Sequence, residues 1–105
     1  MADYLLAYTG GAGMASTEAE REAAMARWGQ WFQGLGSAVV NPGNPFGAST
    51  SVGGSGANGA AKSGLSGFSI VAAENLDAAS KLARDCPVIE SGGSVDVYEA
   101  IPIEM

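Results

Sequence analysis

The stretch GFSIVAAENLDAASKLARDCP, residues 67 to 87, decides the fold. Its beginning, residues 67 to 74, is a short apolar run of the kind that forms strands. Asn75 then offers a side-chain oxygen that can cap a helix, and Asp77 places a negative charge in the first turn. The helix has an apolar face and stops at Pro87. That face carries Leu76, Ala79, Leu82, Ala83 and Cys86, which recur at helical spacing.

The same order, a strand and then a helix, is predicted at the start of the chain. Residues 3 to 8, DYLLAY, are short, aromatic and apolar, and a Gly-rich link follows them. Thr17 and Glu20 then form a capping box, which marks the first turn of a helix. Gly34 and Gly36 end that helix. Its apolar stripe consists of Ala24, Trp28, Trp31, Phe32 and Leu35.

Three further strands complete the pattern. They are predicted at residues 37–40, 48–53 and 94–101, and the Gly-rich stretch 54–64 is predicted as a hairpin or loop with a turn at Asn58 and Gly59. The order β-α-β-β-β-α-β with short links predicts an α+β fold, a ferredoxin-like sandwich. An antiparallel sheet would carry both helices on one face. Residues 1–105 would form a single domain.

The strands are apolar on both faces, which a sheet covered on one side does not need. Leu5 stands next to Leu6, and Ile70 next to Val71, so apolar side chains project to both sides. The predicted helices cover one face, and the chain has no element left for the other. We therefore expect a homodimer in which two sheets pack face to face, a dimeric α+β barrel.

Composition excludes several classes of function. The chain of 105 residues has a net charge of −6 with five basic residues, which disfavours nucleic acid and anionic membrane surfaces as partners. It has no His and one Cys, which leaves no metal-binding cluster, and its Gly-rich link lacks both the GxGxxG pattern and the lysine of a phosphate loop. No cofactor and no metal are expected. The N-terminal residues resemble neither a signal peptide nor a membrane span, so a cytoplasmic location is expected.

Residues 41–47, NPGNPFG, allow two interpretations. Pro42 and Pro45 fix the backbone and end a strand, and the asparagines favour turns, so the stretch is explained as a turn by composition alone. However, Phe46 would be an exposed aromatic on a loop, and loops on a rigid scaffold often carry binding groups. In the second interpretation, Asn44 and Phe46 line the rim of a ligand pocket.

A candidate acid–base pair lies on the last strand. Asp96 and Tyr98 project to the same side because side chains alternate along a strand. In a partly desolvated barrel, Asp96 would act as acid or base and Tyr98 as hydrogen-bond donor. In the alternative, Asp96 pairs with a basic side chain at an edge. Replacing Asp96 with Asn separates the two, because only the first interpretation expects lost binding or turnover.

Four other side chains are weighed in the same way. Tyr8 shares a strand face with Tyr4 and would either form an aromatic wall of a ligand site or pack at the dimer interface. Trp31 lies near the edge of the helical stripe, so of the two tryptophans it is the one expected to reach a cleft. Lys62 would meet an anionic ligand or stay solvated. Cys86 is expected to be a buried small hydrophobe.

Several motifs resemble the YCII-related family, also called the DGPF-domain family. The most specific are residues 67–87 and the following GGSVDVYEAIPIEM, and YLLAYTGG, MARWGQWFQGLG and VVNPGNPFG also look like that family. The resemblance covers nearly the whole chain. It implies a dimeric α+β barrel of ferredoxin-like protomers, with the loop 41–47 near the cleft between helices and barrel.

The chain departs from the family pattern at its chemistry. The Asp-Gly-Pro-Phe motif is replaced by ANGAAKSGLSG, and the His of a His–Asp pair in some relatives is absent, although Asp96 aligns with the acidic residue of the last strand. Tyr98 stands where many relatives have Arg. Two functions remain open. One is a small-molecule-binding protein that acts as a cofactor-independent enzyme of the proton-transfer, lyase or isomerase type. The other is a non-catalytic accessory or regulatory dimer linked to an extracytoplasmic-function sigma factor.

Overall fold

A computed structural model of the chain describes residues 1–10, 17–57 and 59–103. The elements follow one another as β1 (Ala2–Thr9), α1 (Glu18–Leu35), the 3-10 helix η1 (Gly36–Ala38), β2 (Val39–Asn41), β3 (Val52–Gly53), β4 (Gly56–Ala57), β5 (Leu65–Ala73), α2 (Leu76–Ala83), α3 (Pro87–Glu90) and β6 (Ser94–Ala100).

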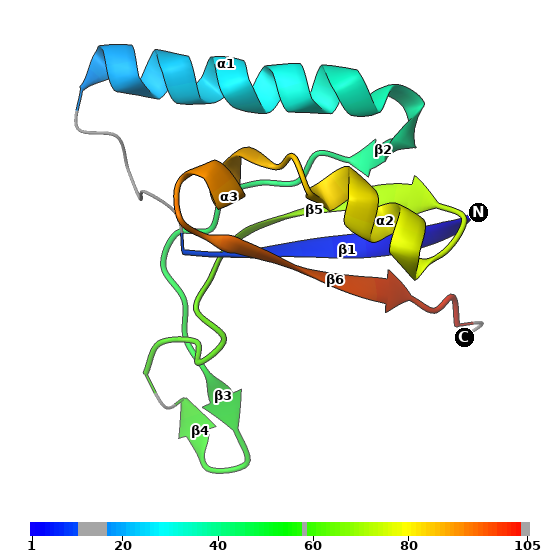
Figure 1. The fold of residues 1–105 in the computed structure, drawn as a ribbon. Coiled ribbons are helices and arrows are strands. Elements are labelled where there is room, and N and C mark those ends of the chain that lie inside the picture. The colour runs from blue at the N-terminus through cyan, green and yellow to red at the C-terminus, as the bar shows by residue number, and fades with distance from the viewer. Residues whose placement is uncertain (11–16, 58, 104–105) are drawn as a thin grey trace.

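Four strands form one antiparallel sheet in the order β2-β5-β1-β6. The central strand β1 pairs with both β5 and β6, so that Leu5 lies opposite Ile70 on one side and Tyr98 on the other. The helices lie on one side of this sheet (Figure 1). The predicted α+β, ferredoxin-like architecture is therefore confirmed.

Both long helices begin where their caps predict. The Thr17 hydroxyl accepts a hydrogen bond from the Glu20 backbone N–H at 3.1 Å, and the Asn75 side chain accepts one from the Ala78 N–H at 2.8 Å. Each cap satisfies a backbone donor that the first helical turn leaves without an intrahelical partner. These local hydrogen bonds fix the residue at which each helix begins.

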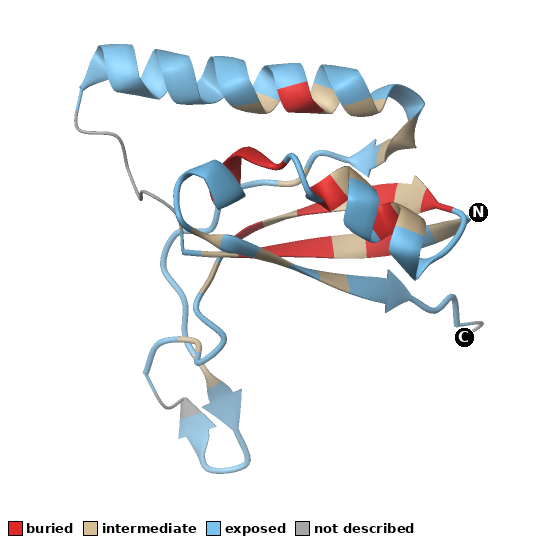
Figure 2. Ribbon diagram, viewed as in Figure 1, coloured by how far each residue is buried: buried red, intermediate tan, exposed pale blue. Residues whose placement is uncertain are grey.

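The core lies between the sheet and the helix layer. Alternate residues of β1 and β5 point into it, and Figure 2 shows the buried segments running along these strands beneath the helices. The core is made of Tyr4, Leu6, Tyr8, Trp31, Val71, Ala73, Ala79, Ala83, Cys86 and Val88. Trp31 is the one buried residue of α1, so most of this long helix is exposed.

The second helix and the central hairpin differ from the prediction. Helix α2 ends at Ala83, and Pro87 begins the short helix α3 because proline is well accommodated in a first helical turn. Of the predicted strand 48–53, only Val52 and Gly53 pair, with Gly56 and Ala57. The hairpin turns at residues 54–55 rather than at the predicted Asn58 and Gly59, and Asn58 lies outside the described residues.

The other face of the sheet is not covered by any helix of the described chain (Figure 1). We call it the open face and define it by Leu5, Ile70, Asp96 and Tyr98, whose pairing places them opposite the core side. Tyr98 is 57% exposed there. The β3–β4 arm also extends from the body on this side, away from α1.

Candidate functional site

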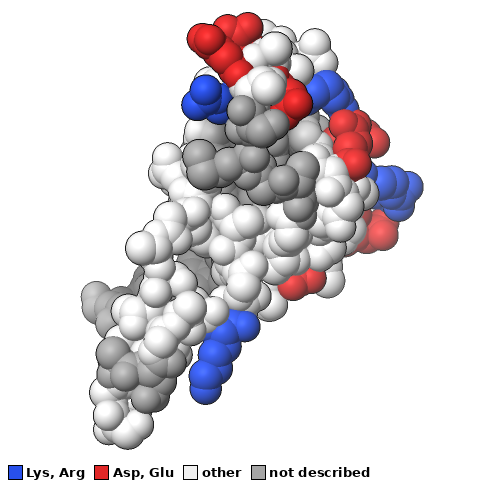
Figure 3. Space-filling model, turned by 90° about the vertical axis from the view of Figure 1, so that its left-hand side faces the viewer, with Lys and Arg blue, Asp and Glu red and all other residues white. Residues whose placement is uncertain are grey.

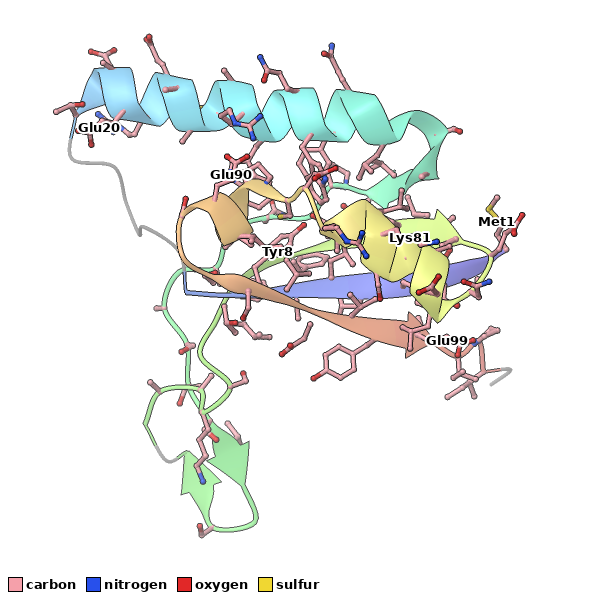
Figure 4. The ribbon with its side chains drawn as sticks, viewed as in Figure 1. Met1, Tyr8, Glu20, Lys81, Glu90 and Glu99 are labelled. Atoms are coloured by element: carbon pink, nitrogen blue, oxygen red, sulfur yellow. The ribbon has the colours of Figure 1, made fainter. Side chains whose placement is uncertain are left out.

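A pocket of about 590 Å³ lies between α1 and the sheet. Trp28 and Phe32 of α1 form one wall, the loop 42–45 forms another, and Tyr8 of β1 and Ser69 of β5 lie at its floor. Figure 4 shows Tyr8 in the space between the helix layer and the sheet. The pocket is therefore built from segments that are far apart in the sequence.

The aromatic side chains around the pocket are held against one another. The ring of Trp28 meets that of Tyr8 edge-on, with centroids 5.2 Å apart, and lies 6.0 Å from Phe32. Such edge and tilted arrangements are the favourable geometries for aromatic pairs. They fix the wall formed by α1, which otherwise has few buried contacts.

The loop after β2 runs along the edge of β5 and forms the pocket rim. The Phe68 N–H donates to the Asn44 carbonyl at 3.3 Å, and the Phe46 N–H donates to the Ser66 carbonyl at 3.0 Å. Gly43 adopts a φ of 74°, and a Cβ atom there would lie 1.8 Å from the Phe68 carbonyl oxygen. Only glycine allows this close approach. The stretch 41–47 is thus an irregular continuation of β2 as well as a turn.

A chain of hydrogen bonds crosses the floor of the pocket. The Tyr8 hydroxyl donates to the Ser69 hydroxyl at 2.6 Å, and the Ser69 hydroxyl donates to the Pro42 carbonyl at 2.7 Å. Burial raises the pKa of the Tyr8 phenol, and the hydrogen bond to Ser69 offsets part of this shift. The phenol is therefore neutral at pH 7. This chain of hydrogen bonds connects β1, β5 and the rim loop.

The thiol of Cys86 lies against this floor and is fully buried, as predicted for a small hydrophobe. Burial raises the pKa of Cys86 from 9.0 to about 11, although a hydrogen bond from the Val88 backbone opposes the shift. Like the phenol of Tyr8, the thiol is neutral at pH 7. Neither group is therefore in the anionic form that a general base needs at pH 7.

The buried thiol predicts a loss of stability in alkali. Above pH 9 the unfolded chain loses the Cys86 proton while the folded chain keeps it, so the free energy of unfolding falls until about pH 11. The loss is about 2–3 kcal/mol, since one pKa unit corresponds to about 1.4 kcal/mol. Urea unfolding at a series of pH values measures it. In Cys86→Ala the decline should begin only above pH 10, where Tyr8 contributes. An unchanged pH profile in that variant would contradict the assignment.

The comparisons with known proteins give the family. The model of the YCII-related domain matches residues 3–104. The chain belongs to the YCII-related family. No curated protein and no solved structure matched it. The resemblance carried by residues 67–87 and 92–105 is thereby confirmed.

The YCII-related domain brings two of the predicted ligand-binding residues to the pocket, Tyr8 and Asn44. The alternative that placed Tyr4 and Tyr8 at a dimer interface is wrong. Their side chains point to the helices and are 3% and 5% exposed. The strand alternates as predicted, but the sequence alone did not show which face the helices cover.

Trp28, rather than Trp31, lines this pocket, and the ligand-binding role predicted for Trp31 remains a prediction. Trp31 is 7% exposed and donates its indole N–H to the Leu82 carbonyl at 3.2 Å, which fixes α1 on α2. It borders instead a second depression of about 490 Å³ between the two helices, together with Arg27 and Lys81. The indole packs between α1 and α2. The sequence of α1 alone does not predict this contact, because it depends on where α2 lies.

The other predicted site residues lie elsewhere. Phe46 is 46% exposed and stacks on Phe68, with ring centroids 5.7 Å apart. Lys62 is exposed in the turn after β4. Asp96 and Tyr98 are on β6 at the open face, opposite Ala7 and Leu5 of β1. The structure does not bring these four residues to the pocket, and their predicted roles remain predictions.

Ser69 is a pocket residue that sequence reasoning missed. Its signal was a polar residue inside the apolar run FSIVAA of β5. A hydroxyl on the buried side of a strand needs hydrogen-bond partners, and Ser69 has two, in Tyr8 and Pro42. Gly43 was also missed, because its close approach to β5 depends on the path of the loop.

The charges of the domain lie outside the pocket. Arg27 of α1 pairs with Glu90 of α3, which Figure 4 shows beneath α1, and Asp77 pairs with Lys81 on α2 at 3.3 Å. Figure 3 shows charged side chains gathered at the top of the molecule and along one side, with a single basic side chain towards the β3–β4 arm. Charge thus belongs mainly to the helix layer.

Within residues 1–10, 17–57 and 59–103, no three His, Cys, Asp or Glu side chains gather closely enough to hold a metal ion. In the same part of the chain, no helix combines the length and apolar character needed to cross a membrane.

Proposed function

We propose that the YCII-related domain binds a small, largely apolar molecule in the pocket under α1. The observation that supports this is an aromatic pocket of about 590 Å³ with one polar chain, Tyr8–Ser69–Pro42, at its floor. Ligand sites in proteins have volumes of about 300–1,000 Å³ and combine apolar walls with a few polar groups that fix orientation. The pocket has both properties.

Binding without proton transfer is the activity that the pocket chemistry favours. Its described lining has no carboxylate, lysine or arginine, and Tyr8 at its floor and the Cys86 thiol beside Tyr8 are both neutral at pH 7. A general base needs a pKa near the working pH. This supports the non-catalytic, accessory alternative over an enzyme that works in this pocket.

A proton-transfer activity would use the other face of the sheet. Asp96 and Tyr98 share the open face, and a carboxylate becomes useful for acid–base work when it is partly desolvated. The proposed role of this pair therefore depends on a cover over that face. We propose that a second copy of the chain provides the cover, because Leu5, Ile70 and Tyr98 form an apolar surface across three paired strands.

Filling the pocket from α1 tests the binding proposal. Gly29 lines the pocket, and a Cβ atom there would meet nothing within 4 Å. In Gly29→Leu we expect ligand binding to weaken at least about tenfold, because the new side chain occupies the pocket. The fold should be kept or stabilised, by about 1 kcal/mol, because leucine favours a helix more than glycine does. Thermal melting and binding titration of a naphthalene ligand measure the two effects.

Gly34→Leu is the matched control. Gly34 is on the same helix, also has free space around it, and does not line the pocket. It should gain the same helix stability and bind ligand like the wild type. Equal binding by wild type, Gly29→Leu and Gly34→Leu would refute a ligand site under α1.

A further inference from the structure

We propose that the pocket under α1 selects neutral, flat ligands that donate a hydrogen bond, such as phenols, over their ethers and over carboxylates. This inference rests on the proposed function, since it names the class of molecule that the same pocket takes. It follows from the direction of the hydrogen bonds at the floor, from the absence of charge in the described lining, and from the shape of the walls.

The direction of the hydrogen-bond chain is fixed at one end. The Pro42 carbonyl can only accept, so the Ser69 hydroxyl must donate its proton to this carbonyl, at 2.7 Å. Ser69 can therefore only accept from Tyr8, and the Tyr8 hydroxyl must donate to it, at 2.6 Å. Both hydroxyl protons are used within the protein.

What remains at the floor is acceptor capacity. The Pro42 carbonyl keeps a lone pair beside the bond from Ser69, and the Tyr8 oxygen, which also pairs with the Cys86 thiol, can accept a further hydrogen bond but has no proton left to donate. A ligand that reaches Tyr8 or Pro42 must therefore bring the proton itself. At this floor, a ligand oxygen that has no proton would face the oxygens of Tyr8 and Pro42 without a hydrogen between them, which costs the desolvation energy of an unpaired polar group.

The described lining offers nothing that could hold an anion by charge. Its polar side chains outside the floor, such as those of Trp28, Asn44 and Ser66, are all neutral. Residues 11–16, which lie outside the described part of the chain, contain no charged residue either. A carboxylate would lose its hydration in this apolar pocket without a cation in exchange.

The walls favour a flat molecule. Trp28 and Phe32 present aromatic surfaces from α1. Gly29, Gly43 and Gly67 also line the pocket, so backbone without side chains faces the ligand there. Planar rings pack well against both kinds of surface. A ring with one hydroxyl at its inner end would fill the apolar part and reach the floor.

Three ligands with the same ring system test the selection on the wild-type protein. They are 2-naphthol, 2-methoxynaphthalene and 2-naphthoate at pH 7, measured by calorimetric titration. We expect 2-naphthol to bind about tenfold more tightly than the ether, and the carboxylate to bind at least about tenfold more weakly than 2-naphthol. Equal or tighter binding of 2-methoxynaphthalene or of 2-naphthoate would overturn the proposal.

Ser69→Ala removes the hydroxyl that accepts the Tyr8 proton at the floor of the pocket. Without Ser69, the Tyr8 hydroxyl regains a free proton and can donate to a ligand oxygen. The preference for 2-naphthol over 2-methoxynaphthalene should then disappear. Ser66→Ala is the control, because Ser66 also lines the pocket but donates to the backbone carbonyls of Tyr8 and Gly10. It should keep the wild-type preference. A preference that survives in Ser69→Ala would contradict the assigned direction.

The outcomes separate this inference from the proposed function. Binding of any naphthalene that is lost in Gly29→Leu supports the pocket, whatever the order of the three ligands. A wrong order then refutes only the selection for donors. If none of the three ligands binds, the proposed function fails, and the inference fails with it.

Discussion

Replacing Gly43 with Ala is expected to destabilise the YCII-related domain by about 3 kcal/mol, since a left-handed backbone costs a residue with a Cβ atom about 1–2 kcal/mol and overpacking about 1–3 kcal/mol. The new Cβ atom would lie 1.8 Å from the Phe68 carbonyl oxygen and 2.7 Å from its carbon, both in backbone. A strand backbone in the middle of a sheet cannot move aside cheaply. The loop 42–45 must therefore leave the edge of β5, and the pocket rim opens.

Gly64→Ala is the matched control for this substitution. Gly64 has a φ of 65°, close to the 74° of Gly43, but a Cβ atom there would meet nothing within 4 Å. Its cost should be the backbone strain alone, about 1 kcal/mol. Urea unfolding of the two variants gives the difference. If both lose the same stability, the contact between Gly43 and β5 does not hold the loop in place.

Leu6→Ala should have an effect of similar size through the core. Leu6 is fully buried between the sheet and the helices, and truncating a buried leucine costs about 2–5 kcal/mol. Leu5→Ala removes the same atoms from the next residue, which points to the open face. For the folding of a single chain, we expect Leu5→Ala to cost less than about 1 kcal/mol, because the side chain is only partly buried.

The two leucines also test the proposed homodimer. If a second copy covers the open face, Leu5→Ala should weaken the dimer at least about tenfold, because an apolar contact at the interface is lost. Leu6→Ala should leave the association of folded chains unchanged. Native mass spectrometry over a concentration series measures both. A wild-type chain that stays a monomer at all concentrations would rule out this cover, and the barrel setting of Asp96 and Tyr98 with it.

Much of the fold was determined by local sequence. Thr17 and Asn75 fix the first turns of α1 and α2 because a cap is a bond between a side chain and a backbone three residues away. The apolar runs of β1, β5 and β6 and the order of the elements predict the ferredoxin-like sheet. Cys86 could be predicted as buried, because its helical neighbours are apolar. Each of these signals acts within a few residues.

The tertiary structure decided which of these surfaces meet. Trp28 and Trp31 share the apolar stripe of α1, but the position of α2 buries Trp31 and leaves Trp28 at the pocket. The strand pattern predicts that Tyr8 alternates with its neighbours, but it does not say which face the helices cover. The difference arises because helix and strand periodicity orders side chains only relative to their own element.

The pocket floor is the clearest case of a feature that only the tertiary structure decides. Tyr8, Pro42 and Ser69 are separated by 27 residues or more, and their hydrogen bonds form only when the loop after β2 runs along the edge of β5. By itself, the sequence determined helices α1 and α2 with their caps, the strands of the main sheet and the order of these elements. Only the tertiary structure decided the site, because a binding pocket is made of contacts between segments, and those contacts depend on how the whole chain closes.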